Sequence, residues 1–165
     1  MLQVILWENL MWKKIALLSL CLWIITLGIG GYFFIKGTGA IDHDGRMAIE
    51  LKREERNLVL AEMRLFLSGI QSILEAITVN DLKFIETTAN SLGMKAAVDV
   101  NPILMAKLPL GFKSIGMGVH KRFDEMAISV HTGKVNKDEV LKEVSDIINT
   151  CVACHQAYRL DEVNK

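Results

Sequence analysis

Residues 136–159, NKDEVLKEVSDIINTCVACHQAYR, decide the fold that we expect for this chain. Asn136 followed three positions later by Glu139 is a variant of the capping box that begins a helix. Apolar side chains then recur at steps of three and four, which is the spacing of one helix face. That face consists of Val140, Val144, Ile147, Ile148, Cys151, His155 and Tyr158. The stretch therefore predicts a helix that carries a cysteine–histidine motif on its buried side.

Three earlier stretches show the same helical spacing, and none shows the alternation of a strand. The first covers residues 46–78. The second begins near Asn80, a favourable N-cap residue, and ends before Pro102. The third runs from Pro109, which a first helical turn tolerates, to Gly133. Four amphipathic helices with short connections predict an all-α protein built as an antiparallel four-helix bundle. The apolar face expected for the first helix is Met63, Phe66, Leu67, Ile70, Leu74 and Ile77.

Ahead of these helices lies an apolar run without charge, residues 15–35. As a helix, its 21 residues match a hydrocarbon core of about 30 Å, which predicts a single transmembrane helix. Lys13 and Lys14 precede it and Lys36 follows, which favours an N-terminus on the cytoplasmic side. A cleaved signal peptide is the alternative, but its apolar region usually has only about 7 to 15 residues.

The chain then divides into three parts. Residues 1–36 form the N-terminal segment with its membrane anchor, and translation from Met1 or from Met11 stays open. Glycines and short polar side chains in residues 37–46 suit an exposed linker. Residues 47–165 form the single folded domain.

Composition excludes two classes of protein. Nineteen basic residues balance nineteen acidic ones, so the concentrated positive charge of a nucleic-acid-binding protein is missing. Three cysteines are too few for a disulfide framework of several bridges.

The pair Cys151 and Cys154, followed directly by His155, is the signature of c-type haem attachment. Each thiol can add to one vinyl group of a haem, and the histidine can ligate its iron. A thioredoxin-like dithiol is one alternative, although that motif belongs to a βαβ pattern that is absent here. A zinc site is another, for which His120 or His131 would have to supply a further ligand. We expect one covalently bound haem c.

The motif and its surroundings resemble one known family. CVACHQAYR, residues 151–159, close to the C-terminus of four helices is similar to the class II cytochromes c, and the resemblance covers about residues 53–160. It implies that the first helix of the bundle covers the distal side of the haem. The stretch 62–64 resembles the one that supplies the distal residue, so Met63 becomes a candidate sixth iron ligand. The haem pocket candidates are Phe66, Leu67, Tyr158 and Arg159.

Some of these residues have a second interpretation. Met63 also lies on the apolar face of its helix, where methionine commonly fills the core. Tyr158 and Arg159 are expected to continue the helix on the side of His155. Arg159 would then either pair with a haem propionate or act as an ordinary cation at a helix C-terminus. His120 and His131 are expected to be satisfied by neighbouring groups rather than by iron.

The expected function is one-electron transfer by a single-pass cytochrome in the cytoplasmic membrane of a bacterium, with the haem domain on the periplasmic side. Its partners would be redox proteins or a membrane oxidoreductase complex, and a homodimer is left open. One alternative is a five-coordinate haem that binds nitric oxide or carbon monoxide. Another is a fixed haem subunit of a larger membrane complex. An enzyme is not expected, because no acid, base or nucleophile constellation accompanies the motif.

Overall fold

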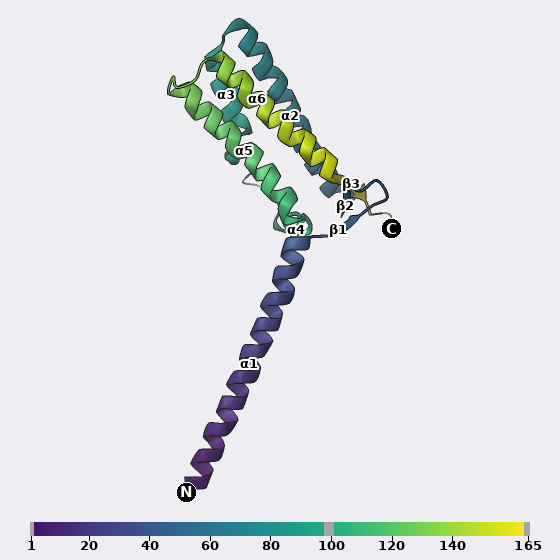
Figure 1. Ribbon diagram of the computed structural model, residues 1–165, viewed down its shortest axis with the longest axis vertical. Helices are drawn as coiled ribbons and strands as arrows, with labels where there is room; N and C mark the ends of the chain where they lie inside the picture. The colour runs from purple at the N-terminus through teal and green to yellow at the C-terminus, as the bar shows by residue number, and fades with distance from the viewer. Residues whose placement is uncertain (1, 98–100, 164–165) are drawn as a thin grey trace.

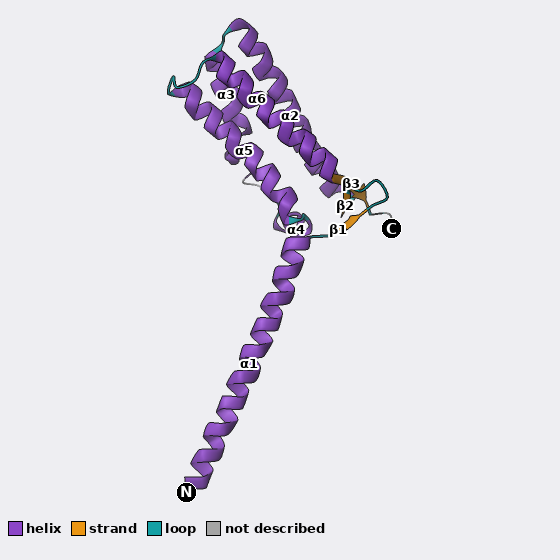
Figure 2. Ribbon diagram, viewed as in Figure 1, coloured by secondary structure: helices purple, strands orange, loops and turns teal. Residues whose placement is uncertain are grey.

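The computed structural model describes residues 2–97 and 101–163 and is mostly helical, at 78% (Figures 1 and 2). The α-helices are α1 (Leu2–Lys36), α2 (Arg53–Val79), α3 (Leu82–Leu92), α4 (Pro102–Lys107), α5 (Leu110–His131) and α6 (Lys137–Ala157). The remaining elements are the 3₁₀ turn η1 (Met94–Ala97) and the strands β1 (Gly39–Ile41), β2 (Met47–Leu51) and β3 (Tyr158–Glu162). We call everything described after α1 the head.

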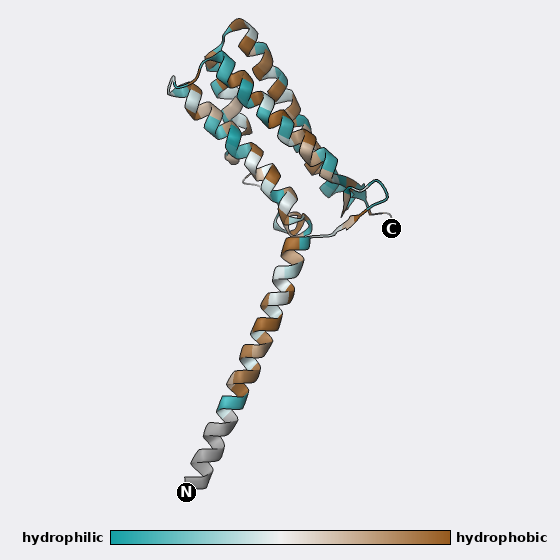
Figure 3. Ribbon diagram, in the orientation of Figure 1, coloured by the Kyte–Doolittle hydropathy of each residue, from teal (hydrophilic) through white to brown (hydrophobic). Residues whose placement is uncertain are grey.

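Helix α1 projects away from the head as a long rod (Figure 1), and the part from Trp12 on is mostly apolar (Figure 3). Its 25 residues Trp12–Lys36 are long and apolar enough to cross a membrane, and none of the apolar window is buried against the rest of the protein. At 1.5 Å per residue this stretch reaches about 37 Å, which exceeds a hydrocarbon core of about 30 Å. Helix α2 is the other helix of the described residues that meets the same criterion. It is partly buried and belongs to the core of the head.

One hydrophobic core joins α2, α3, α5 and α6. Each helix contributes a side chain that is completely buried: Ile73, Ile85, Phe123 and Ile147. Burying such a side chain stabilises a fold by about 1.5 to 3 kcal/mol. This core therefore holds the four long helices of the head together.

The core position of Ile147 gives a direct test of the packing. Replacing Ile147 by Ala is expected to lower the free energy of unfolding by about 2 to 5 kcal/mol, because it leaves a cavity that neighbouring helices fill only in part. The neighbouring residue Ile148 is 40% exposed, which corrects its predicted place on the buried face. Ile148→Ala is therefore the matched control and should cost far less. Urea denaturation measures both. Equal costs would contradict the helix orientation described here.

The start of α6 confirms the predicted capping box. The Asn136 side-chain oxygen accepts hydrogen bonds from the backbone N–H groups of Asp138 at 2.9 Å and Glu139 at 3.1 Å. In return the Glu139 carboxylate accepts one from the backbone N–H of Asn136 at 2.7 Å. Three backbone donors at the helix N-terminus are thus satisfied, and the start of the motif-bearing helix is set.

The boundary between α2 and α3 differs by one residue from the expected one. Asn80 adopts a left-handed conformation, with φ at 57°, and ends α2. Asp81 is the residue that caps α3, and its carboxylate accepts a hydrogen bond from the backbone N–H of Phe84 at 2.9 Å. Asparagine tolerates the left-handed region better than most residues, which explains why it closes one helix instead of opening the next.

The expectation that the chain lacks strands is wrong. A three-stranded sheet has the order β1-β2-β3. Strand β1 pairs antiparallel with β2, and β2 pairs parallel with β3. Strand β2 replaces the start of the helix expected over residues 46–78, and β1 lies within the segment expected to be a linker. Pairing between β2 and β3 joins segments more than a hundred residues apart, so no local periodicity in the sequence reports it.

Candidate functional site

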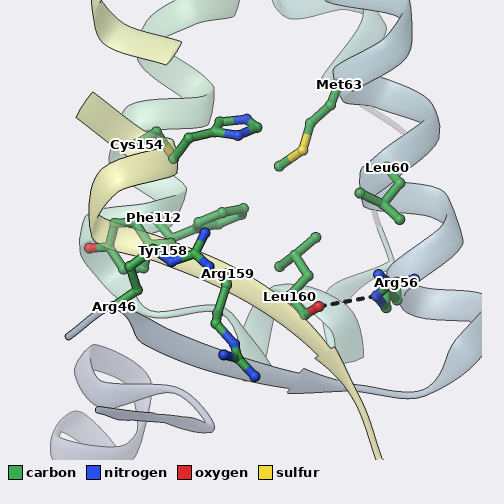
Figure 4. A pocket seen from close by; sticks show the side chains of 10 residues that line it. Arg46, Arg56, Leu60, Met63, Phe112, Cys154, Tyr158, Arg159 and Leu160 are labelled. Atoms are coloured by element: carbon green, nitrogen blue, oxygen red, sulfur yellow. Dashed lines mark hydrogen bonds between the residues drawn. The ribbon is translucent and has the colours of Figure 1, made fainter. Parts of the chain in front are cut away.

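A cavity opens at the end of the head where the sheet meets α2, α5 and α6 (Figure 4). It encloses about 180 Å³ and is open to solvent on one side. We call it the α2–α6 cavity. Its lining residues are Arg46, Arg56, Leu60, Met63, Phe112, Cys154, His155, Tyr158, Arg159 and Leu160. Five of the residues singled out by the sequence are among them: Met63, Cys154, His155, Tyr158 and Arg159.

The last turn of α6 supplies the first wall. Cys154 and His155 both line the cavity, and the helix ends two residues later at Ala157. His155 is exposed, which corrects its predicted place on the buried side of the helix. The backbone N–H of Tyr158 still bonds to the Cys154 carbonyl oxygen and closes this last turn. Cys151 lies one turn earlier and packs against the core shared by the four long helices. One helix end therefore places a thiol and an imidazole at the cavity, with a second thiol just behind.

Helix α2 supplies the opposite wall. The side chain of Met63 reaches into the cavity, and its sulfur atom faces the space between α2 and α6 (Figure 4). Met63 is half-buried and also packs on a second, smaller core at this end of the head. Leu60, three residues earlier, extends the same wall. The thioether and the imidazole of His155 therefore lie on facing elements around one space.

Aromatic and aliphatic side chains close the floor of the cavity. The rings of Phe112 and Tyr158 meet edge to face, with 5.4 Å between their centroids. Phe112 belongs to the smaller core, and Leu160 packs against that core together with Tyr158. This floor shields one side of the cavity from water.

Three guanidinium groups lie around the cavity. Arg159 pairs with Asp161 at 2.7 Å and also with Asp42. The hydrogen bond to Asp161 raises the pKa of Arg159 and lowers that of the Asp161 carboxyl. Arg46 pairs with Asp44 at 2.6 Å.

Arg56 differs from the other two. Its Nε–H donates a hydrogen bond to the Leu160 carbonyl oxygen at 3.1 Å (Figure 4). Among the described residues, none of the ion pairs involves Arg56. Arg56 is therefore the cavity cation with the most donor capacity left for an anionic group, since a guanidinium carries five N–H donors.

The two cysteines of the motif are free thiols. Burial raises the pKa of Cys151, and burial together with the neighbouring Cys151 raises that of Cys154. Both also lie near the C-terminal end of α6, where the helix dipole disfavours a thiolate. Both effects oppose the thiolate that a dithiol oxidoreductase or a zinc site requires. Within residues 2–97 and 101–163, no group of three or more His, Cys, Asp or Glu side chains is arranged to hold a metal ion.

Two of the expected pocket residues lie elsewhere. Phe66 packs in the main core, stacked on Phe123 with 5.7 Å between the ring centroids. Leu67 is 68% exposed, so its assignment to the buried face and to the pocket is corrected. At 100° per residue, Leu67 lies about 80° around the helix from Val59 and about 60° from Ile70, at the margin of the apolar stripe.

The histidines outside the motif do not reach the cavity. His120 is buried, with Nδ1 at 2.7 Å from the Leu92 carbonyl oxygen and Nε2 at 3.1 Å from the Glu62 carboxylate. Burial lowers the pKa of His120, but the hydrogen bonds to Glu62 and Leu92 outweigh it and the net shift is upward. His131 is exposed, and its Nδ1 lies 3.0 Å from Glu86. His120 thus has a partner on each ring nitrogen, and His131 lies on the surface beside Glu86.

Tyr158 and Arg159 reach the cavity from β3 and not from the helix, which corrects the expected continuation of α6. The other lining residues were not singled out by the sequence. Arg56 lies seven residues before Met63, two helical turns away on the same face, so this spacing could have found it. Leu160 lies in β3 and Arg46 directly precedes β2, and local periodicity does not report the sheet.

No protein-family model, curated protein or solved structure matches this chain.

Proposed function

We propose that this chain is a membrane-anchored c-type cytochrome that carries single electrons through one covalently bound haem. One observation carries the proposal: Met63 of α2 and the pair Cys154 and His155 of α6, from opposite ends of the head sequence, line one cavity. The CxxCH motif indicates covalent haem attachment by its sequence alone. The cavity adds a thioether across from its histidine, which is the ligand pair of electron-transferring cytochromes c.

The arrangement of the helices supports a finer statement. Helices α2, α3, α5 and α6 share one core, and the motif lies near the end of the last of them. We propose that they form the four-helix bundle of a class II cytochrome c, with the sheet β1-β2-β3 as an addition at its open end. Bundles of this kind build cofactor sites from side chains on facing helices.

The residues around the cavity fit a haem. Cys151 and Cys154 would hold it through thioethers, each formed when the S–H adds across a vinyl group, with sulfur on one carbon and the proton on the other. His155 and Met63 would ligate the iron, and the haem would supply one-electron exchange between ferric and ferrous states.

Apolar lining residues suit the apolar faces of a haem, and cationic lining residues suit its propionate groups. Phe112, Leu60 and Leu160 would cover its apolar faces and exclude water, which favours the less charged ferrous state. Arg46, Arg56 and Arg159 line the cavity, and their guanidinium groups would receive propionate groups. Arg56 is the strongest candidate because Arg159 already pairs with Asp161 and Asp42.

Absorption spectra of the oxidised and reduced protein test this proposal. We expect sharp α and β bands in the reduced state and a low-spin spectrum in the oxidised state, as His/Met ligation requires. A protein without a Soret band would contradict the proposal. An oxidised protein that is already high-spin, and that binds carbon monoxide when reduced, would favour the alternative function of binding a small gas.

The apolar helix α1 supports the proposed location. We propose that residues 15–35 cross the cytoplasmic membrane of a bacterium once, with the head on the periplasmic side. Lys13 and Lys14 ahead of the span favour this orientation. An anchored carrier meets redox proteins of the same membrane by diffusion in two dimensions, which is a physical reason to retain the helix.

Membrane retention is a separate prediction. The mature protein is expected to stay with the membrane fraction after carbonate extraction and to keep residues 15–35, because the 25-residue stretch Trp12–Lys36 is long and apolar enough to cross a membrane and its apolar window is not buried against the head. Cell fractionation followed by N-terminal sequencing measures both. A soluble periplasmic protein that begins near Ala40 would show that the segment is a cleaved signal peptide.

A further inference from the structure

The end of helix α1 is bonded to the head, although an exposed linker was expected there. Lys113 of α5 is only 8% exposed. Its ammonium nitrogen lies 3.3 Å from the carbonyl oxygen of Phe34, in the last turn of α1, and 3.3 Å from that of Met105. It also lies 3.9 Å from the centre of the Phe34 ring. A buried cation of the head therefore caps the C-terminal end of the apolar helix.

The two residues after α1 continue this contact. The backbone N–H of Thr38 donates a 2.8 Å hydrogen bond to the Lys107 carbonyl oxygen in α4. The Thr38 hydroxyl lies 3.2 Å from the carbonyl oxygens of both Lys107 and Glu50. Backbone and side chain of one residue thus tie the exit of α1 to two elements of the head.

Gly37 makes the close approach possible. It has a φ of +62°, and a Cβ atom built on it would overlap the Lys107 carbonyl oxygen and lie 2.6 Å from the Pro109 nitrogen. Only glycine combines this backbone conformation with a contact of that kind at no steric cost. Gly45 shares the positive φ, at +80°, but has open space around it.

Electrostatics explains why this joint resists opening. The last carbonyl groups of a helix lack intrahelical partners and carry the negative end of its dipole, so a cation is stabilised there. Among the described ion pairs, none involves Lys113. Bending α1 away from the head would leave a buried ammonium group with fewer partners, which is unfavourable.

We propose that residues 34–38 form a rigid joint, stabilised by the contacts of Lys113, that holds the head in one orientation on its membrane helix. The proposal rests on the membrane anchoring proposed above. The sheet and the end of α6, which line the α2–α6 cavity, lie at the same end of the head as the joint (Figure 1). The joint therefore holds the cavity at the membrane-facing end of the head. The partner that fits this placement is a redox protein embedded in the same membrane.

Spin labels can measure the joint in the haem-loaded, full-length protein in lipid nanodiscs. Cys21 of α1 is the one cysteine outside the motif, so it takes the first label, and Ser145→Cys on the exposed side of α6 takes the second. Pulsed dipolar spectroscopy should give a single narrow distance peak. Gly37→Ala should lose that peak and give a broad distribution, whereas Gly45→Ala should keep it. Lys113→Met should broaden the peak, and Lys121→Met, at an exposed position of the same helix, should not.

A broad distribution in the unsubstituted protein would overturn the rigid joint. The same holds if Gly37→Ala and Gly45→Ala give identical narrow peaks. Should Lys113→Met fail to fold, the glycine pair still decides, because Gly37 lies outside both hydrophobic cores. Carbonate extraction separates this proposal from the previous one: a narrow peak in a protein that washes off membranes supports the joint and contradicts the anchor.

Discussion

Replacing Cys151 and Cys154 together by Ala is expected to remove all covalently attached haem from the protein. Each thioether needs one of these sulfur atoms, and the third cysteine of the chain, Cys21, lies in α1 apart from the cavity. Haem staining of the denatured protein after electrophoresis measures the effect. Single substitutions should leave attachment through the remaining sulfur, weakened in yield.

Cys21→Ala is the matched control for this experiment, and it should stain like the unsubstituted protein. Staining that survives the double substitution would show that the haem is held elsewhere. Retained zinc in the unsubstituted protein, lost on substitution, would instead support a metal site made of the two thiols.

Substitution of Met63 has the second largest expected effect. Met63→Leu keeps an apolar side chain of similar size but removes the thioether, so the oxidised haem should become high-spin and the reduced haem should bind carbon monoxide. The reduction potential should fall by on the order of 0.1 V, since axial ligands set haem potentials over a range of about 0.8 V. Absorption spectroscopy and a redox titration measure both changes.

Met105→Leu is the control, because Met105 packs against the same small core but does not line the cavity. It should change neither spin state nor potential. A low-spin spectrum that persists in Met63→Leu would require a different sixth ligand. His120 is a poor candidate for that role, since both ring nitrogens already have partners in Leu92 and Glu62.

The elements that the sequence predicts well are those whose signals are local. A helix buries residues at steps of three and four, so the sequence places Ile147 on a buried face, whereas Ile73, which is fully buried, is missing from the face predicted for its helix. The capping box at Asn136 is local in the same sense, because its two hydrogen bonds join residues three positions apart. The residue at which α6 begins can therefore be predicted from the sequence.

The features that the sequence did not predict depend on contacts between distant segments. Strand β2 forms because residues 47–51 pair with residues 158–162 at the other end of the head. The same pairing draws Arg159 out of the helical register and into contact with Asp42. Leu67 is apolar but exposed. It lies at the margin of the apolar stripe, where an apolar residue type is a weak indication of burial.

The candidate site shows both cases together. Its motif and Met63 were predictable, the first from a five-residue signature and the second from a resemblance. Most of the cations around the cavity could not be predicted. Arg46, for example, reaches the cavity from beside β2, a strand that no periodicity in the sequence predicts. The rigid exit of α1 escaped prediction for a related reason: Gly37 and Thr38 are typical linker residues, and only their contact with Lys107 shows that they are fixed.

The central claim is that one haem is covalently bound through the motif at the end of α6. The intact mass of the denatured, full-length protein tests it most directly, because denaturation releases every haem that is held by ligation alone. We predict a mass that exceeds the polypeptide by one haem, with the extra mass confined to the proteolytic peptide that contains residues 151–155. A denatured protein with the bare polypeptide mass, from cells that assemble c-type cytochromes, would contradict the claim.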